Sequence, residues 1–68
     1  MIQDRDKPHK CPVCGQYTFP TKASFDICSV CGWEDDYLQE IELDFAGGAN
    51  KLSLNENRKR WANGERAI

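Results

Sequence analysis

The sequence predicts a small α+β domain that is held together by something other than a hydrophobic core. The chain has 68 residues, and a domain of this size buries too little apolar surface to be stable by packing alone. Such a domain usually needs a staple, that is, a cross-link such as a disulfide or a bound metal ion. Two Cys-x-x-Cys turns lie close together, short alternating segments indicate strands, and a capped segment near the carboxyl terminus indicates a helix.

Every cysteine of the chain lies in one of these two turns: Cys11, Cys14, Cys28 and Cys31. Two residues between the thiols let a tight loop present both sulfur atoms to one ion, and two such loops complete a tetrahedral four-sulfur site. A glycine follows each turn and can adopt the left-handed conformation that directs backbone N–H groups at the sulfur atoms. The four cysteines are therefore the predicted metal ligands, in a double knuckle like that of zinc ribbons and rubredoxins.

Zinc is the predicted ion, one per chain, because four thiolates close the tetrahedron and leave no position for water, as in structural zinc sites. Iron stays open as an alternative, since a tetrahedral sulfur shell also suits iron. Two disulfides are disfavoured because residues 1–10 lack the apolar run of a secretory signal, and intracellular thiols stay reduced. A thioredoxin-type redox pair is disfavoured because no βαβ pattern surrounds either turn.

The four-cysteine domain is predicted to span residues 11–64. Residues 1–10 are polar and charged and are expected to form a flexible arm, while 65–68 are expected to form a short tail. His9 lies two residues before Cys11 but is predicted to be solvated, because four thiolates already fill the metal shell.

Two alternating segments separate the cysteine pairs and predict a β-hairpin. Residues 16–19 and 24–27 alternate polar and apolar side chains, and 20–23 supply turn chemistry. The hairpin would lead directly into Cys28. Four of its apolar side chains are expected to cover the metal loops: Tyr17, Phe19, Phe25 and Ile27.

Acidic residues follow the second turn directly. Trp33 is predicted to be a core residue packed on the second knuckle. The three carboxylates after it are predicted to lie in a solvated turn or in the first turn of a helix, where the helix dipole favours them. A tryptophan beside acidic residues would also suit an interface anchor, so four residues are candidates for partner binding: Trp33, Glu34, Asp35 and Asp36.

Residues 37–45 fit two periodicities. Tyr37 and Ile41 share a helical spacing with Trp33, whereas apolar and acidic residues alternate from Ile41 onward as in a strand. The second half of this segment is predicted to be extended. Residues 47–50, Gly-Gly-Ala-Asn, are predicted to end any regular element.

A helix is predicted near the carboxyl terminus. Residues 53–56, Ser-Leu-Asn-Glu, have the pattern of a capping box, in which the serine and glutamate side chains satisfy first-turn N–H groups. The basic residues 58–60 lie towards the negative end of the helix dipole, and Gly64 is placed to end the helix. Leu54 and Trp61 form a narrow apolar stripe, so the helix is expected to dock by few residues and to expose a basic face.

The charges are unevenly distributed. The net charge is −2, so the chain as a whole is not attracted to nucleic acid or to an anionic membrane. No transmembrane segment or lipidation signal is found, and the chain is expected to be a cytoplasmic monomer. From residue 23 to residue 50 there is no Lys or Arg, and this segment carries the acidic residues Asp26, Glu34, Asp35, Asp36, Glu40, Glu42 and Asp44.

The motifs occur in a definite order: CPVC, an aromatic segment, CSVCGWEDD, GGAN and SLNENR. This order resembles that of the bacterial cysteine-rich CPCC family, small proteins inferred to bind zinc, and the resemblance runs from about Cys11 to the end of the predicted helix. Val13 stands where the family has a third clustered cysteine, so that extra thiol is not required for the Cys-x-x-Cys pair. The resemblance implies the fold and the metal rather than an activity.

Three functions fit the sequence. The first is a protein-binding module whose acidic middle segment faces a basic partner, for example as an inhibitor or immunity-type protein in the basic cleft of a nucleic-acid-handling enzyme or toxin. The second is a nucleic-acid-binding zinc ribbon, which residues 58–60 and Trp61 would support. The third is rubredoxin-like electron transfer. Catalysis is not expected, because the cysteines are committed to the metal and a closed shell cannot activate water.

Overall fold

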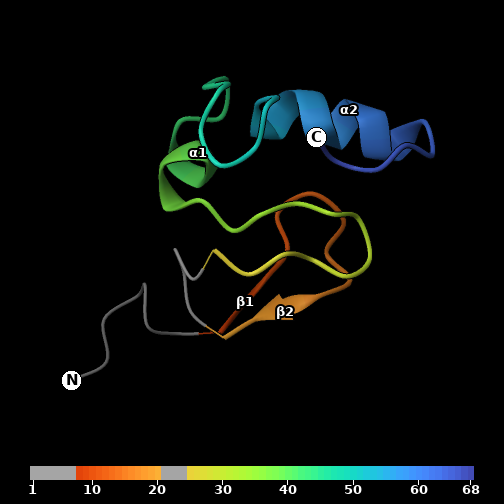
Figure 1. Cartoon of the computed structure of the whole chain (residues 1–68). Coiled ribbons are helices and arrows are strands. Elements are labelled where there is room, and N and C mark those ends of the chain that lie inside the picture. Colours follow the sequence, from red (N-terminus) through yellow and green to blue (C-terminus); the bar gives the residue numbers. More distant parts are fainter. Residues whose placement is uncertain (1–7, 21–24) are drawn as a thin grey trace.

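The computed structural model describes residues 8–20 and 25–68 (Figure 1). The described chain contains two short strands, β1 (His9–Lys10) and β2 (Thr18–Phe19), followed by two helices, α1 (Tyr37–Ile41) and α2 (Leu54–Ala62). The predicted class, a small α+β domain with a β-hairpin and a four-cysteine cluster, is confirmed. The described residues include two helices rather than the single helix predicted.

The first cysteine turn lies at the tip of a hairpin. β1 and β2 pair antiparallel, with His9 opposite Phe19 and Lys10 opposite Thr18. The backbone N–H of Cys11 donates to the carbonyl oxygen of Tyr17 at 2.7 Å and extends this ladder to the turn itself. His9 and Lys10 were assigned to a flexible arm, but they form one of the two strands that support the first knuckle.

The second cysteine turn is supported in the same way. Ile27 and Glu34 form an antiparallel bridge, and the N–H of Cys28 donates to the carbonyl oxygen of Trp33 at 2.8 Å. The N–H of Asp35 donates to the carbonyl oxygen of Asp26 at 2.9 Å. Each knuckle therefore reverses the chain between its own pair of extended segments.

The predicted pairing of residues 16–19 with 24–27 is wrong. Each Cys-x-x-Cys-Gly turn already reverses the chain, and each extended segment pairs with the segment across its own knuckle. Residues 21–24, which include three residues of the predicted turn and the first residue of the segment 24–27, lie outside the described residues. Phe25 and Ile27 are exposed and do not cover the metal loops, whereas Phe19 is buried with the edge of Tyr17 against it, at 5.0 Å between ring centroids.

Helix α1 occupies the first half of residues 37–45, where Tyr37 and Ile41 have helical spacing, and the second half does not form the extended segment that was predicted. Its N-cap is Asp36, whose side chain accepts hydrogen bonds from the N–H groups of Leu38 at 2.9 Å and Gln39 at 3.4 Å. None of residues 42–53 lies in a strand. The apolar residues that suggested a strand are exposed and have no neighbouring sheet to pack against, so the N-cap determines the local structure.

Among the described residues, the interior contains almost as many polar as apolar side chains. Its apolar part is small, and the predicted core position of Trp33 is confirmed. The buried hydrophobic residues are Cys11, Phe19, Cys28, Cys31, Trp33 and Leu54, and the buried polar residues are Asp35, Gln39, Asn50, Ser53 and Asn57.

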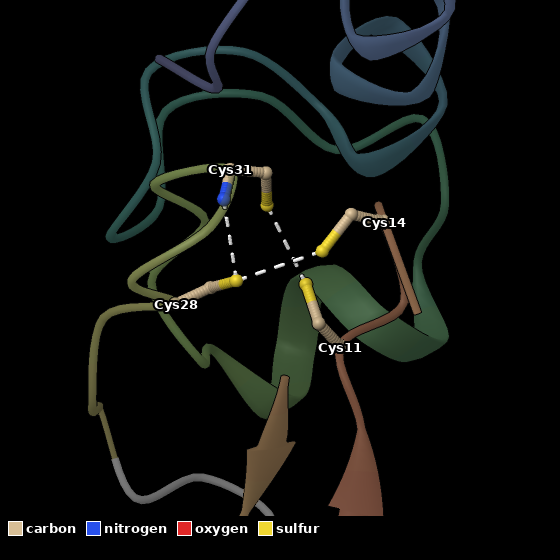
Figure 2. A group of neighbouring side chains, drawn as sticks. All are labelled: Cys11, Cys14, Cys28 and Cys31. Atoms are coloured by element: carbon tan, nitrogen blue, oxygen red, sulfur yellow. Dashed lines mark hydrogen bonds between the residues drawn. The ribbon is translucent and has the colours of Figure 1, made fainter. Parts of the chain in front are cut away.

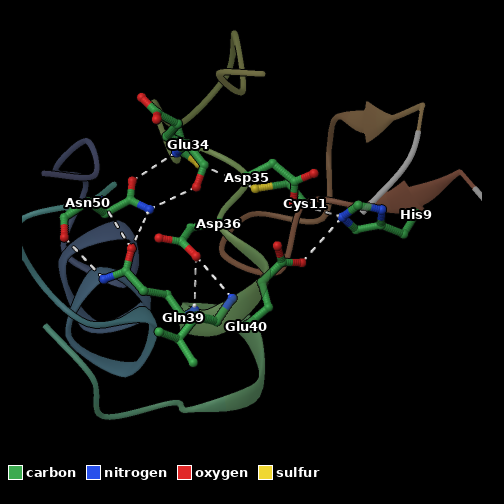
Figure 3. A network of polar contacts seen from close by, with 10 residues as sticks. His9, Cys11, Glu34, Asp35, Asp36, Gln39, Glu40 and Asn50 are labelled. Carbon is green, nitrogen blue, oxygen red and sulfur yellow. Dashed lines mark hydrogen bonds and ion pairs between the residues drawn. The ribbon is translucent and has the colours of Figure 1, made fainter. Parts of the chain in front are cut away.

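Two buried amides hold the irregular segment after α1 in place (Figure 3). The Gln39 side chain donates to the carbonyl oxygens of Phe45, Asn50 and Leu52 at 3.0, 3.0 and 3.3 Å, and accepts from the backbone and side-chain nitrogens of Asn50. The Asn50 side chain pairs with both the N–H and the carbonyl of Glu34, each at 2.8 Å. These bonds take the place of a β-ladder.

Gly48 lets the chain approach α1 closely. A Cβ atom at this position would lie 2.6 Å from a carboxylate oxygen of Asp36 and 2.9 Å from Cδ of Gln39. The same Asp36 carboxylate accepts a hydrogen bond from the N–H of Ala49 at 2.9 Å. The turn predicted at residues 47–50 is confirmed, and it packs against the N-terminus of α1.

Helix α2 lies on the opposite side of the molecule from β1 and β2 (Figure 1). As predicted, the Ser53 hydroxyl accepts from the N–H of Glu56, at 3.1 Å. Gly64, with φ of 82°, ends the helix in a Schellman motif: its N–H donates to the carbonyl of Trp61, and the next N–H donates to the carbonyl of Arg60, both at 2.9 Å.

The segment 65–68 was predicted to be a tail outside the domain, but it packs on the second knuckle. The N–H of Ala67 donates to the carbonyl oxygen of Cys31 at 2.7 Å. Ile68 forms hydrogen bonds with Leu52 and with the buried Asn57 side chain. Among the helices described here, none has the length and apolarity that a membrane span requires.

Candidate metal centre

The four predicted ligands converge on one point (Figure 2). Their sulfur atoms all lie within 4.8 Å of one another. Two close contacts join one knuckle to the other: the sulfur atoms of Cys11 and Cys31 are 3.5 Å apart, and those of Cys14 and Cys28 are 3.6 Å apart. All four cysteines are free thiols, so the disulfide alternative is wrong. Tetrahedral coordination with bonds of about 2.3 Å places sulfur atoms about 3.8 Å apart, and the cluster fits one such ion.

Backbone N–H groups point at the sulfur atoms, as the glycine after each turn predicts. The N–H of Gln16 lies 3.4 Å from Sγ of Cys14, and the N–H of Trp33 lies 3.4 Å from Sγ of Cys31. Gly15 and Gly32 have φ of 70° and 92°, in the left-handed region. Hydrogen bonds of this kind stabilise thiolates, which are the form that binds metal.

Burial opposes ionisation of the cluster while no cation is bound. Loss of solvation raises the pKa of Cys11 to about 11 and raises that of Cys31 as well. Burial also acts on Cys28, but N–H groups of Cys31 and Val30 outweigh it and lower the pKa of Cys28. At neutral pH the four thiols are therefore not all ionised, and a cation has to displace protons in order to bind.

Metal binding at pH 7 is accordingly expected to release about two protons per ion or more, because Cys11 and Cys31 hold theirs up to alkaline pH. The apparent affinity should therefore rise with pH into the alkaline range and fall in acid, by about tenfold per pH unit for each proton released. Calorimetric titration with zinc in two buffers of different ionisation enthalpy measures the proton count. A heat of binding that does not depend on the buffer would contradict this expectation.

Two arginines contact the knuckles from outside. Nε of Arg58 donates to the carbonyl oxygen of Pro12 at 2.8 Å, and Nη1 of Arg66 donates to that of Val30 at 3.2 Å. Pro12 and Val30 each lie between the two cysteines of a turn. Four thiolates and a divalent cation sum to two negative charges, which two guanidinium groups balance. The basic residues of α2 were predicted only to form an exposed face, and the contacts of Arg58 and Arg66 with the knuckles were not predicted.

The residues predicted to bind a partner do not form a surface. Trp33 and Asp35 are fully buried, and that part of the prediction is wrong. Glu34 is half-buried and its backbone pairs with Asn50, while the Asp36 side chain caps α1. A tryptophan next to the second knuckle packs into the core because so few other large apolar residues are available there.

His9 is also not where it was predicted to be. Its side chain is only 16% exposed, and Nε2 lies 3.0 Å from Oδ1 of Asp35 and 3.2 Å from Oε1 of Glu40 (Figure 3). The prediction of a solvated histidine fails because the pairing of β1 with β2 brings His9 onto the edge of the domain interior. The sequence carried no signal for this pairing.

Exposed apolar side chains gather on α1 and directly after it. Tyr37, Leu38 and Ile41 are exposed, and the buried residue of the helix is Gln39. Leu43 and Phe45 are exposed in the segment that follows. The helix is therefore inverted, with a polar residue inside and apolar residues outside. The alternating pattern of residues 41–45 predicted an extended segment and gave no indication of this exposed apolar surface.

Comparison with known protein families gives a match. Residues 9–64, most of the chain, match the family model described as Cysteine-rich CPCC. A search of curated proteins found no relative. The matched range begins at β1 and ends at the glycine that terminates α2, so it includes both knuckles and both helices.

Proposed function

The chain belongs to the cysteine-rich CPCC family, and from this premise we propose that it is a zinc-stapled protein-binding module that presents α1 and the residues after it to a basic protein. The zinc ligands are Cys11, Cys14, Cys28 and Cys31. A closed four-sulfur shell has a structural role and leaves no position for a reactive water, so we assign the module no catalytic step.

We propose zinc rather than iron. The sulfur shell suits both ions, but none of the described residues around it indicates a redox role. Metal analysis of protein purified without added zinc tests this choice. One zinc per chain and a colourless solution are expected. Red protein with one iron per chain would instead support rubredoxin-like electron transfer.

The inverted helix is the observation that carries the binding role. Tyr37, Leu38 and Ile41 are 42, 47 and 56% exposed, while Gln39 is fully buried. A helix in a monomeric domain normally buries its apolar stripe. An apolar group that is displayed instead, together with Leu43 and Phe45, is typical of a protein-interaction surface. We call these five exposed residues, Tyr37, Leu38, Ile41, Leu43 and Phe45, the α1 surface.

The charges around the α1 surface specify the kind of partner. Glu42 and Asp44 are exposed between its apolar residues, and the chain has no Lys or Arg from residue 23 to residue 50. A complementary partner would have an apolar centre with Lys and Arg around it. Electrostatic attraction of this kind raises the association rate and excludes acidic partners. A basic cleft of a nucleic-acid-handling enzyme or toxin has this chemistry, which makes an inhibitor or immunity-type role the specific form of the proposal.

The test compares three variants in affinity capture from the host, followed by affinity measurement with the purified partner. We expect Leu38→Ser/Ile41→Ser and Glu42→Gln/Asp44→Asn each to weaken binding of a basic protein by at least about tenfold, because they remove the apolar centre and the charged rim respectively. Lys59→Gln on the exposed side of α2 is the matched control and should bind like the wild type. Capture of only neutral or acidic proteins at low salt, or equal binding by all variants, would overturn the proposal.

Nucleic-acid binding has less support than protein binding. Three arginines of α2 and the adjoining segment already donate to backbone carbonyls of the chain: Arg58, Arg60 and Arg66. Single-strand binders combine a basic groove with several stacking aromatic residues, and Trp61 on α2 is half-buried. A gel shift with mixed oligonucleotides at low salt separates the two functions, since the protein-binding module should produce none.

A further inference from the structure

A second group of metal-ligating side chains lies outside the four-sulfur centre (Figure 3). It combines His9 from β1, Asp35 from the segment after the second knuckle, and Glu40 from α1. The three ligand atoms, Nε2 of His9 and one carboxylate oxygen from each acid, all lie within 4.8 Å of one another. We propose that these three side chains bind a second divalent cation.

The arrangement of the three ligand atoms suits a cation. Nε2 of His9 faces Oδ1 of Asp35 at 3.0 Å and Oε1 of Glu40 at 3.2 Å. A divalent cation accepts a lone pair from all three atoms at once.

The spacing of the ligand atoms fits a metal ion. Adjacent ligands of an octahedral ion with bonds of about 2.1 Å are about 3.0 Å apart, and those of a tetrahedral ion about 3.4 Å apart. The separations of 3.0 and 3.2 Å fall in this interval. An ion could therefore contact the three side chains with little movement of the backbone.

Burial and donor chemistry indicate which ions would bind. Asp35 is fully buried, while the side chains of His9 and Glu40 are 16 and 11% exposed, so an ion and its remaining water ligands can reach the group from one side. One imidazole and two carboxylates suit first-row divalent ions such as Mn²⁺, Fe²⁺ and Zn²⁺ better than a thiolate-selective ion. The bound ion would join β1 to α1 on the inner side of the helix.

The experiment uses zinc-loaded protein and Mn²⁺ alone as the probe, because Mn²⁺ prefers nitrogen and oxygen ligands and does not displace zinc from thiolates. Electron paramagnetic resonance of free Mn²⁺ gives the amount bound. We expect one Mn²⁺ per chain, with binding weakened more than about tenfold by His9→Asn or Glu40→Gln. Glu42→Gln is the matched control, since Glu42 is an exposed carboxylate two residues from Glu40, and it should leave the affinity unchanged.

A measurement on the wild type covers the case in which a variant fails to fold. Substoichiometric Mn²⁺ should broaden the NMR signals of His9, Asp35 and Glu40 first and leave those of the exposed Glu65 unchanged. Failure of zinc-loaded wild type to bind Mn²⁺ would show that the three side chains form only hydrogen bonds and ion pairs. An equal loss of binding in Glu42→Gln would show diffuse attraction to the acidic segment. Either result overturns the proposal.

Discussion

Removal of the metal from the four-sulfur centre is expected to unfold the chain. Among the buried hydrophobic residues that the structure describes, only Phe19, Trp33 and Leu54 are not cysteines, and a core of this size contributes at most a few kcal/mol of net stability. Zinc bound by four thiolates contributes on the order of 10 kcal/mol at neutral pH. Excess chelator should therefore abolish the near-UV circular dichroism of Trp33 and the dispersion of the NMR spectrum, and added zinc should restore both.

A substitution gives the same result without a chelator. Cys28→Ser is expected to prevent folding even in excess zinc, because Cys28 is buried and its sulfur lies next to that of Cys14 and accepts from the N–H of Cys31. Ser29→Ala is the matched control: it is an exposed position in the same turn and should fold and bind zinc normally. If the near-UV signal survives in the chelator, the core is sufficient by itself and the metal is not the staple.

Gln39→Met is expected to cost about 3–5 kcal/mol of stability, although the two side chains have similar volumes. The substitution leaves the carbonyls of Phe45, Asn50 and Leu52 without the donor that Gln39 provides, and a buried polar group that loses its partner costs about 1–3 kcal/mol. Neither knuckle depends on these bonds, so zinc should stay bound while residues 42–52 lose protection. Chemical denaturation and amide hydrogen exchange measure the two effects separately.

Asn55→Ala is the control for the effect of losing a side-chain amide. Asn55 donates to the carboxylate of Asp44 at 2.9 Å in an exposed contact, and its loss should change stability by less than about 0.5 kcal/mol. If Gln39→Met were equally mild, water would be replacing the Gln39 amide, and the interior after α1 would be more open than its burial indicates.

The features that depend on local spacing could be predicted from the sequence. Two residues between thiols and a glycine after them define a knuckle whatever the rest of the chain does, so the four-sulfur cluster followed directly. The N-cap at Ser53 and the stop at Gly64 are local for the same reason, because each acts through backbone groups within one turn.

The features that depend on which segments meet could not be predicted. Residues 16–19 and 24–27 have strand patterns, but pattern alone does not identify the partner of a strand, and each partner turned out to lie across a knuckle. The role of Gln39 could not be predicted either. A glutamine among apolar residues of a short helix is normally exposed, and here it is buried because the loop around it supplies five hydrogen-bonding groups.

The inversion of α1 separates two kinds of selection. The side chains of Gln39 and Asp36 form hydrogen bonds with backbone groups of the chain, so almost any substitution at these two positions would destabilise the fold and be selected against. Leu38 and Ile41 lie on the exposed side of the helix, so the stability of the fold does not constrain these two side chains in the same way. Related chains could therefore diverge at the outward positions and change their targets while keeping one architecture, and a display library randomised at those positions would be a route to new binders on the same frame.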